Sequence, residues 1–482
     1  MTVPLRTRTG RAVILATVLG SSVAMLDATV VNLALPRIGE DLGASVADLQ
    51  WVVSGYTLTL ASLILLAGAL GDRLGRRRVF VWGTVWFTAA SVVCALAPTI
   101  ELLVAARIVQ GVGAALLTPG SLALLSGAIA PDDRGTAIGL WSGLGGVASA
   151  AGPLLGGWLV EVGSWRAVFW LNVPLAAAVV WVSVRHVPES RDPDPSERLD
   201  LPGAALGVLA LVFLTYGLIA GQAAPLIVGG AAFAAFVAAE LRGSEPLVPP
   251  SLFRSRVFTA ANLVTLTVYA ALGGVFFLLV LQLQIVVGYS PIAAGLATLP
   301  ITVLMLALSA RTGRWAQHHG PRLPMTVGPL IGAAGLVLML RIGPDASYLA
   351  DVLPAVTVFG LGLSTLVAPL TGAVLNSVPT ERSGIASGVN NAVARTAQLL
   401  AVAALPGLAG ITGTTDVRAF SNGFGVAMLA CAGLMLAGAV LAAVLLPRQG
   451  TVVTAPDSIE CRPHCDVAAP TLDPRRPETD RP

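Results

Sequence analysis

Two charged residues lie inside long apolar stretches, where a charge is costly to place. Asp27 is the one carboxylate well inside such a stretch, and Arg107 lies inside another. An ionisable group at membrane depth is a functional hypothesis by default. We expect Asp27 to alternate between binding a proton and interacting with Arg107 or a substrate, which is the chemistry of exchange. The structural alternative is an acid satisfied by the backbone and by hydroxyls such as Thr29.

The spacing allows these two groups to meet. Asp27 lies eight residues before Leu35, and Arg107 lies five residues after Leu102, each counted to one end of its apolar stretch. At about 1.5 Å of rise per residue, both groups lie roughly 8 to 12 Å from the same boundary of a helical bundle. We therefore predict that the carboxylate and the guanidinium can reach each other.

The composition indicates which elements position them. Hydrophobic residues make up 55% of the 482-residue chain and charged residues 11%, whereas a soluble domain carries roughly 25% charged residues. This excludes most soluble enzymes. The apolar runs are continuous, unlike the alternating segments of a membrane β-barrel, and a spanning helix needs about 20 apolar residues. The sequence predicts an all-α polytopic membrane protein.

Fourteen apolar segments are predicted to span, in groups of six, two and six. They are Ala12–Leu35, Trp51–Leu70, Val79–Ala97, Leu102–Ser126, Thr136–Val160, Ala167–Val184, Leu201–Ala220, Pro225–Leu241, Phe258–Val286, Ile292–Ala310, Met325–Leu340, Asp351–Val374, Ile385–Leu408 and Gly423–Leu446. The predicted organisation is an N-terminus (1–11), a first six-helix half (12–187), a linker (188–200), two extra helices (201–241), a loop (242–257), a second half (258–446) and a disordered tail (447–482).

The arginines predict the orientation of these spans. All 29 basic residues are Arg, and 23 of them fall in segments on one side if both termini share that side, against four on the other. Because Lys and Arg concentrate in cytoplasmic loops, both termini are predicted to be cytoplasmic. The four cysteines are too few for an extracellular disulfide framework.

A weak internal repeat relates the two six-helix groups. The loop from Gly68 to Arg77 aligns with the loop from Gly313 to Arg322, and the segment from Pro131 recurs from Pro379 at nearly the same offset. Even spacing preserves the orientation of each copy. Parallel repeats of this kind occur in secondary transporters, whose substrate sites lie between the halves near the midplane.

Four motifs carry a resemblance to the major facilitator superfamily and, within it, to the fourteen-span drug:proton antiporters. They are Leu26-Asp27-x-Thr29-x-x-Asn32-x-x-x-Pro36, Gly68-x-Leu70-Gly71-Asp72-Arg73-x-Gly75-Arg76-Arg77, Arg107-x-x-Gln110-Gly111 and Gly152-Pro153-x-x-Gly156-Gly157. Shorter echoes are Gln50-Trp51, Trp165-Arg166-x-x-Phe169-x-x-Asn172-x-Pro174 and Gln284-x-x-x-Gly288. Two departures are Gln317, where the second-half loop lacks an acid, and Ala148, where the family has glycine.

The resemblance implies a conformational gate in the loop after the second span. Its residues are Gly68, Gly71, Asp72, Arg73, Gly75, Arg76, Arg77 and Arg134. The acid Asp72 is expected to pair with the N-terminus of the thirteenth span near Gly384, where the helix dipole favours a carboxylate, or with Arg134. The alternative is an ordinary basic anchor loop, which explains the arginines but not Asp72.

The resemblance also implies an antiporter motif formed by Gly152, Pro153, Gly156 and Gly157. Gly152 and Gly156 share one helical face and permit close backbone approach, while Pro153 bends or opens the helix. We expect a tight seam between the halves that limits proton leak. The alternative is simple helix packing.

A polar face toward a cavity between the halves is predicted on the thirteenth span. The proposed lining residues are Asn32, Trp51, Tyr56, Gln110, Tyr269, Gln282, Asn390, Asn391 and Arg395, although each aromatic could equally be an interfacial or packing residue. Lipophilic or cationic drugs would suit such a cavity. No nucleotide-binding loop is visible in the sequence, so no cofactor is expected, and no metal site is expected from the Cys461, His464 and Cys465 cluster of the tail.

The leading hypothesis is therefore a proton-driven exporter of small drug-like molecules, acting as a monomer in the plasma membrane without nucleic acid. Symport of a nutrient, or export of a metabolite by the same fold, is the main alternative, and the motif at Gly152 and Pro153 disfavours symport. A membrane enzyme would need paired intramembrane acids or a zinc motif, and the sequence has neither. A receptor would need a soluble sensory or output domain.

Overall fold

A computed structural model describes residues 3–191, 199–243, 246–379, 382–411 and 416–447 of the chain. The chain divides into two units, residues 1–446 and 447–482, and every helix given below belongs to the first. The predicted tail, with Cys461, His464 and Cys465, lies outside the described residues, as does the central part of the predicted linker.

The first half consists of helices joined by very short turns. They are α1 (Arg8–Leu42), α2 (Val46–Leu74), α3 (Arg76–Leu96), α4 (Ile100–Ala128), α5 (Pro131–Val162), α6 (Trp165–Trp170) and α7 (Asn172–His186). The turn between α1 and α2 combines a left-handed Gly43 with a capping box of Ser45 and Asp48. Gly75, at φ 113°, turns the chain directly from α2 into α3.

Two further helices and a second half follow. The extra pair is α8 (Leu201–Ala220) and α9 (Ala223–Arg242); the second half has α10 (Arg256–Leu281), α11 (Pro291–His319), α12 (Arg322–Leu338), α13 (Leu353–Leu375), α14 (Ser383–Leu408) and α15 (Val417–Leu445). Short turns are η1 (Pro250–Arg254), η2 (Gln282–Val286), η3 (Met339–Arg341) and η4 (Tyr348–Val352). One predicted span, Ala167–Val184, is broken at Leu171 into α6 and α7.

Twelve helices in the described part of the chain are long and apolar enough to cross a membrane. The segments of the fifth and thirteenth predicted spans form α5 and α14, which are not among those twelve. Helix α14 is the more polar of the two for a clear reason, since it carries Asn390, Asn391 and Arg395. Polar residues on a buried helix lower its mean hydropathy without preventing it from packing inside a bundle.

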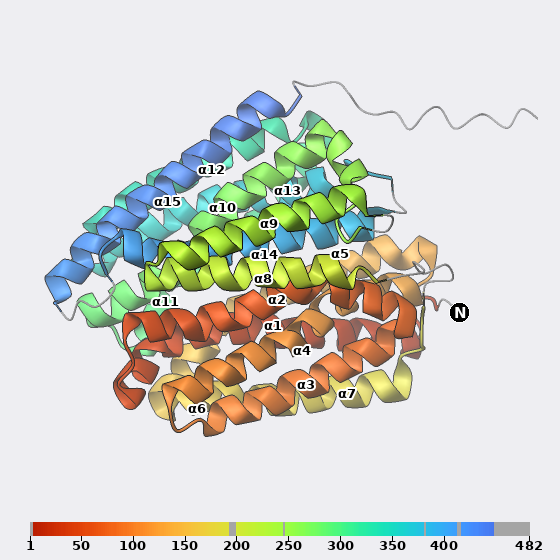
Figure 1. The fold of residues 1–482 in the computed structure, drawn as a ribbon, viewed down its shortest axis with the longest axis horizontal. Helices are drawn as coiled ribbons and strands as arrows, with labels where there is room; N and C mark the ends of the chain where they lie inside the picture. The colour runs from red at the N-terminus through yellow and green to blue at the C-terminus, as the bar shows by residue number, and fades with distance from the viewer. Residues whose placement is uncertain (1–2, 192–198, 244–245, 380–381, 412–415, 448–482) are drawn as a thin grey trace, which may run out of the picture. The chain divides into compact units, whose positions relative to one another are not determined.

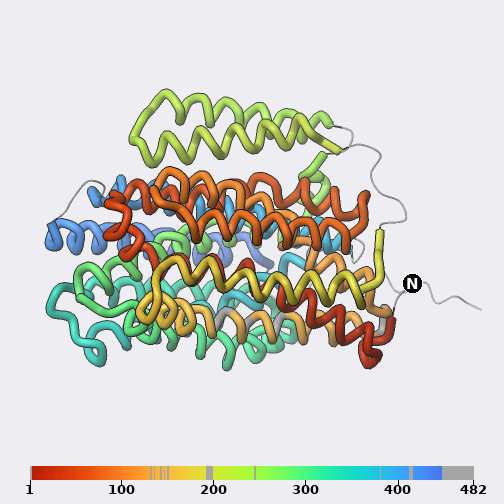
Figure 2. Tube along the Cα trace, turned by 90° about the horizontal axis from the view of Figure 1, so that it is seen from below, coloured from red at the N-terminus to blue at the C-terminus, as the bar shows by residue number. Residues whose placement is uncertain are grey.

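The two halves pack through specific helix pairs. Helix α5 packs on α11, and α2 packs on α14, while α8 contacts both α2 and α14. Figure 1 shows α1–α4, α6 and α7 grouped along one edge and α10, α12, α13 and α15 along the other. Figure 2 shows the α8–α9 hairpin as a separate layer on one side of the bundle. We call the end where α1 turns into α2 the far end, and the end where α2 turns into α3 the near end.

Equivalent helices of the two halves approach in the same way. A Cβ added at Gly113 of α4 would lie 2.5 Å from the backbone nitrogen of Phe87 on α3, and one added at Gly335 of α12 would lie 2.5 Å from that of Phe359 on α13. Glycine is therefore needed at both places, as at small-residue interfaces in membranes. The third and fourth helices of each half are thus packed backbone to backbone.

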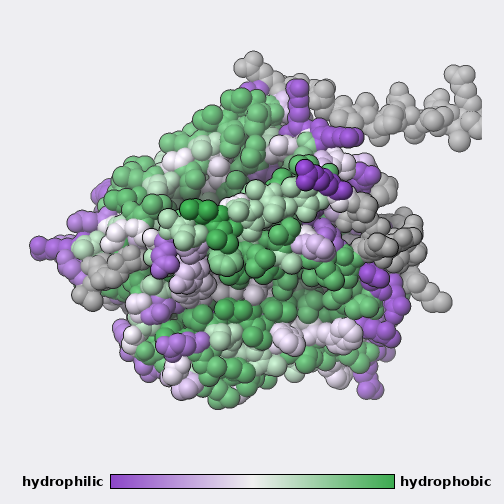
Figure 3. Space-filling view, viewed as in Figure 1, coloured by the Kyte–Doolittle hydropathy of each residue, from purple (hydrophilic) through white to green (hydrophobic). Residues whose placement is uncertain are grey.

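The surface matches a membrane-embedded bundle. Figure 3 shows hydrophobic surface over the middle of the molecule and hydrophilic residues gathered at both ends. Large exposed side chains include Trp82, Trp86, Trp158 and Ile227, which are 50 to 71% exposed. In water such a surface would be far above what soluble proteins expose, whereas lipid accommodates it.

Candidate functional site

A sealed polar cluster surrounds Asp27 in the first half. Both Asp27 and Arg107 are 1% exposed. An Arg107 NH group donates to Oδ2 of Asp27 at 2.5 Å, and Gln110 Nε2 donates to Oδ1 at 3.0 Å. Asn172 Nδ2 also donates to Oδ1, at 2.9 Å. The expected meeting of Asp27 and Arg107 is present, and α1, α4 and α7 each supply part of it.

Arg107 is held on all sides. Its Nε donates to the carbonyl of Val52 at 3.1 Å, and its NH group donates to Gln110 Oε1 at 2.7 Å. The guanidinium carbon lies 4.2 Å from the centre of the Tyr56 ring, a cation–π contact. Tyr56 thus covers the ion pair with its ring, and Gln110 bridges acid and base, so both belong to this cluster rather than to a solvated lining.

The buried ion pair of Asp27 and Arg107 is costly to break. Removing one partner from a buried ion pair costs about 3–5 kcal/mol because the other charge stays buried and uncompensated. Protonation of Asp27 neutralises its charge without removing the side chain, so it weakens the hold on Arg107 in the same way.

Asn172 is the member of the cluster to which sequence reasoning assigned no role. Its Nδ2 also contacts Ser91 Oγ at 3.0 Å, and Ser91 in turn donates to the carbonyl of Phe169 at 2.9 Å. The available signal was the motif echo that ends in Asn172-x-Pro174, together with an amide alone in an apolar run. The break between α6 and α7 at this point aims the amide at α1.

On the expectation from the sequence that Asp27 exchanges a proton, we predict that Asn172→Ala lowers proton-driven transport by about tenfold or more, because a hydrogen bond to a buried charged group contributes about 1.5–3 kcal/mol. Transport should be measured in vesicles with an imposed pH gradient. Ser91→Ala, which removes only the remote partner of the amide, is the matched control and should have a smaller effect. Equal losses in the two variants would argue that the amide has only a packing role.

The polar face of the second half lies on α14 and α10. Asn390 Nδ2 donates to Asn262 Oδ1 at 3.1 Å and to Thr265 Oγ1 at 2.8 Å. The Arg395 guanidinium donates to Gln398 Oε1 at 3.4 Å. Asn390, Asn391, Arg395 and Tyr269 are all half-buried. This is the face that the sequence placed toward a cavity.

Two other predicted lining residues, Gln282 and Trp51, lie elsewhere, and the assignment of Asn32 to the cavity stays a prediction. Gln282 is fully buried within the second half, where its Nε2 donates to the carbonyl of Ile342 at 2.7 Å and to Ser421 at 3.1 Å, so its assignment to the cavity is corrected. Trp51 faces the extra helices, with its ring 6.3 Å from that of Tyr216 on α8. Asn32 is half-buried, and its Oδ1 has no partner among the described residues.

The loop after α2 is paired differently from the expectation. Asp72 accepts hydrogen bonds from Arg76, four residues on, at 2.8 Å. Arg134 instead donates to the carbonyl of Ile129 at 3.2 Å, so the expected pairing of Asp72 with Arg134 is absent. A Cβ added at Gly384, at the start of α14, would meet nothing within 4 Å. The acid is held by its own loop.

The glycine motif of α5 faces two different helices. A Cβ added at Gly152 or Gly156 would contact α1 of the same half, the latter at 2.8 Å from a Val30 methyl group. At Gly157 it would lie 2.6 Å from the Cα of Ile292 on α11, in the other half. The expected seam between halves is therefore made by Gly157 and not by the pair Gly152 and Gly156.

The hydrogen bonds that join the halves, for the described residues, lie at the far end. Gln50 Nε2 on α2 donates to the carbonyl of Val402 on α14 at 2.8 Å, and Gln284 Nε2 donates to the carbonyl of Leu33 at 3.0 Å. Glu161 at the end of α5 accepts from Ser290 at 2.8 Å and from the backbone N–H of Ile292 at 3.1 Å. The halves are thus locked at the far end.

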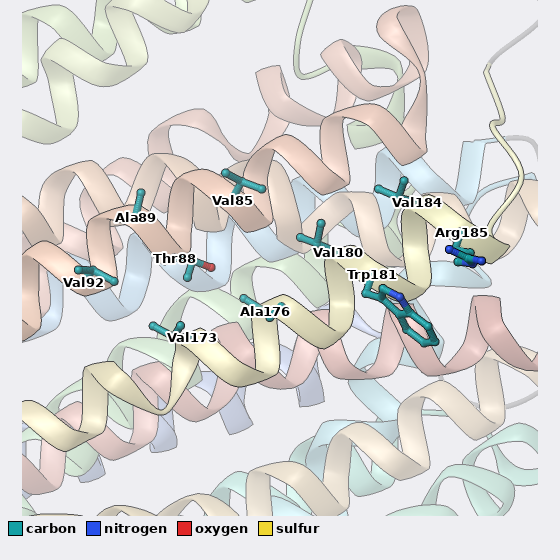
Figure 4. Close-up of a pocket in the computed structure, with 11 residues that line it drawn as sticks. Val85, Thr88, Ala89, Val92, Val173, Ala176, Val180, Trp181, Val184 and Arg185 are labelled. Atoms are coloured by element: carbon teal, nitrogen blue, oxygen red, sulfur yellow. The ribbon is translucent and has the colours of Figure 1, made fainter.

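A groove on the outer surface of the first half lies away from this cluster. It has a volume of about 720 Å³ and lies between α3 and α7. Figure 4 shows its lining, which is apolar apart from Thr88 and Arg185. Because Asp27, Arg107 and Arg395 are not among its lining residues, this outer groove does not supply the chemistry described above.

Comparisons with known proteins agree with this arrangement. Residues 17–402 match the model of the Major Facilitator Superfamily. The chain is 36% identical to the cephamycin export protein CmcT of Amycolatopsis lactamdurans, over 87% of this chain and 89% of that protein. It is 35% identical to the puromycin resistance protein pur8 of Streptomyces alboniger, over 91% of each. It is also 35% identical to the tetracenomycin C resistance and export protein of Streptomyces glaucescens, over 81% of this chain and 74% of that protein.

Solved structures show the same fold. The crystal structure of a D-xylose-proton symporter aligns with a TM-score of 0.66 at 16% identity, over 91% of this chain and 98% of that one. A POT family transporter in complex with a thioalcohol-conjugated peptide aligns with a TM-score of 0.69 at 15% identity, over 90% and 97%. Because the family model matches most of the chain and these relatives align over most of their own length, the chain belongs to the major facilitator superfamily.

Proposed function

We propose that this protein exports antibiotics or other drug-like molecules in exchange for protons and so confers resistance to them. The observation that carries the exchange is the sealed ion pair of Asp27 and Arg107 in the first half. The direction of transport is supported by the relatives, whose names describe export and resistance. No cofactor is needed, because the proton gradient supplies the free energy.

In the proposed cycle, the described conformation is the one closed at the far end by the hydrogen bonds of Gln50, Gln284 and Glu161. Substrate enters between the halves from the near end while Asp27 and Arg107 remain paired. After the halves rock open at the far end, a proton reaches Asp27, Arg107 is released, and the substrate leaves. Returning to the described state delivers the proton to the near side and restores the pair. The loop at Asp72 acts as the near-end gate that closes in the other state.

We further propose that α5 and α14 also span the membrane, which makes fourteen spans in groups of six, two and six. With an even number of spans both termini lie on one side, and the distribution of arginines makes that side the cytoplasm. The near end then faces the cytoplasm. The protein is proposed to act as a monomer in the plasma membrane, since each half-to-half contact of the site is made within one chain.

Everted membrane vesicles acidified inside test the direction of transport. The proposed antiporter should accumulate a drug in the lumen, and collapsing the pH gradient with a protonophore should release it. A proton-coupled symporter, the second candidate, would instead carry its substrate out together with protons. Accumulation that persists without any gradient would contradict both.

The far-end contact of Glu161 allows a prediction about the resting conformation. In Glu161→Gln, the loss of a carboxylate at the N-terminus of α11 should shift the balance toward far-end opening by about two- to fivefold, since such contacts contribute about 0.3–1 kcal/mol. The measurement is labelling of a cysteine placed at Leu33, which is 3% exposed, by a membrane-impermeant maleimide in a variant lacking the native cysteines. Glu40→Gln, an exposed far-end acid paired within its own helix, is the control and should leave labelling unchanged.

A further inference from the structure

We infer that Arg395 binds an acidic group of the transported molecule, so that the carrier is selective for organic anions. This inference rests on the proposed export function and specifies its substrate class. Arg395 lies in α14 on the face that carries Asn391, four residues before it, and it is half-buried. An arginine inside a membrane bundle is retained only where it has a partner or lines a polar path.

Among the described residues of the second half, no acid forms an ion pair with Arg395. Between Glu245 and Glu381 the sequence has only two carboxylates, Asp345 and Asp351. Asp351 lies at the start of η4, before α13, and is paired with Arg341 at 3.0 Å. The hydrogen bond to Gln398, at 3.4 Å from a neutral amide on the same helix, is long and does not compensate the charge. The guanidinium therefore keeps most of its donors for a ligand.

The first half cannot supply the missing charge either. Asp27 is the acid closest to membrane depth, and its two oxygens are occupied by Arg107, Gln110 and Asn172. Arg107 and Asp27 cancel each other, so Arg395 leaves the core of the bundle with one net positive charge. A cationic substrate is therefore repelled from the described state, whereas an anion is attracted.

The position of Arg395 suits a site between the halves. Ala392, one helical turn before it on α14, packs against the first-half cluster that contains Tyr56, and the hydroxyls of Tyr56 and Tyr269 lie within range of the Arg395 charge. A carboxylate or phenolate bound here would have the guanidinium on one side and the aromatic ring of Tyr269 nearby. Arginine is suited to this task because its planar fork can bind a carboxylate through two hydrogen bonds.

This site also ties substrate charge to the proton cycle. Export of an anion against entry of a proton moves two charges in the direction that an inside-negative potential favours, twice as many as export of a neutral molecule.

The test compares two dyes that share one aromatic scaffold and differ in charge. Fluorescein is an anion and rhodamine 123 a cation, and binding of each to the purified, detergent-solubilised protein can be followed by fluorescence polarisation. Wild type should bind fluorescein at least about tenfold more tightly than rhodamine 123, which corresponds to one charge-assisted hydrogen bond. Arg395→Gln should remove that preference, and Arg395→Lys should keep part of it. Arg311→Gln, an exposed arginine that donates within α11, is the control and should leave both affinities unchanged.

Two results would overturn the proposal. One is fluorescein that binds wild type no more tightly than rhodamine 123, or does not bind. The other is an unchanged fluorescein affinity in Arg395→Gln protein that elutes as a single folded species. The binding assay uses no ion gradient, so failure of proton-driven transport would contradict the proposed function while leaving this result intact.

Discussion

Replacing Asp27 by Asn is expected to abolish proton-driven accumulation while leaving drug binding in place. At about 100 mV, one charge crossing the membrane provides roughly 2.3 kcal/mol, which supports an approximately 50-fold gradient of a neutral substrate at 1.36 kcal/mol per tenfold. A carboxamide neither takes up nor releases a proton at this site, so the variant should sustain a ratio of about one. Two measurements are compared. One is proton-driven accumulation of the drug in everted vesicles, and the other is exchange of labelled for unlabelled drug without a gradient.

The expected cost to stability separates coupling from folding. Asp27→Asn leaves Arg107 buried without its counter-charge, and we expect about 3–5 kcal/mol of lost stability. Adding Arg107→Gln removes the uncompensated charge, so the double variant should recover much of its melting temperature and still fail to couple protons. Asp41→Asn is the matched control on α1, because Asp41 is half-exposed and bound to Arg166 outside the cluster. Full proton-driven accumulation by Asp27→Asn would exclude Asp27 as the coupling group.

The positions of the helices were largely predictable from the sequence, because continuous apolar runs and glycine or capping residues between them are local signals. Each apolar segment predicted to span overlaps a helix. The break at Leu171 was not predicted, because Ala167–Val184 is one apolar run. Asn172 is the one amide side chain within it. A single polar residue changes the mean hydropathy of a segment of 18 or more residues too little to indicate a break.

Contacts between helices were predictable only where two rare residues had to share one depth. Asp27 and Arg107 met that condition, and the structure brings them together. Gln282 did not meet that condition, because a glutamine side chain can donate to a backbone carbonyl of its own half, here that of Ile342. The rotation of α5 about its axis decides whether Gly156 or Gly157 faces the other half, and one residue is 100° on a helix. Asp72 is paired with Arg76, four residues on in its own loop, a local partner that the sequence analysis did not consider.

The seam between α5 and α11 provides the second large effect, in Gly157→Ala. The added methyl group would lie 2.6 Å from the Cα of Ile292 and 2.8 Å from the carbonyl oxygen of Pro291, both at the start of α11. Backbone atoms cannot rotate away, so the far end has to open or strain, at about 1–3 kcal/mol. Because α11 belongs to the other half, the strain exists only while the far end is closed. The variant should populate the far-open state about 5- to 150-fold more than wild type.

Two alanine variants of the same helix make this prediction specific. At Gly145 an added Cβ meets nothing within 4 Å, so Gly145→Ala should leave the conformational balance unchanged and slightly favour the helix. At Gly156 it presses on Val30 of the same half, so Gly156→Ala should lower stability without favouring either state. Maleimide labelling of the cysteine at Leu33 should rise only in Gly157→Ala. If labelling rises equally in Gly156→Ala, the seam acts through the packing of the first half, and the closure of the far end has to be sought in the hydrogen bonds of Gln50, Glu161 and Gln284 instead.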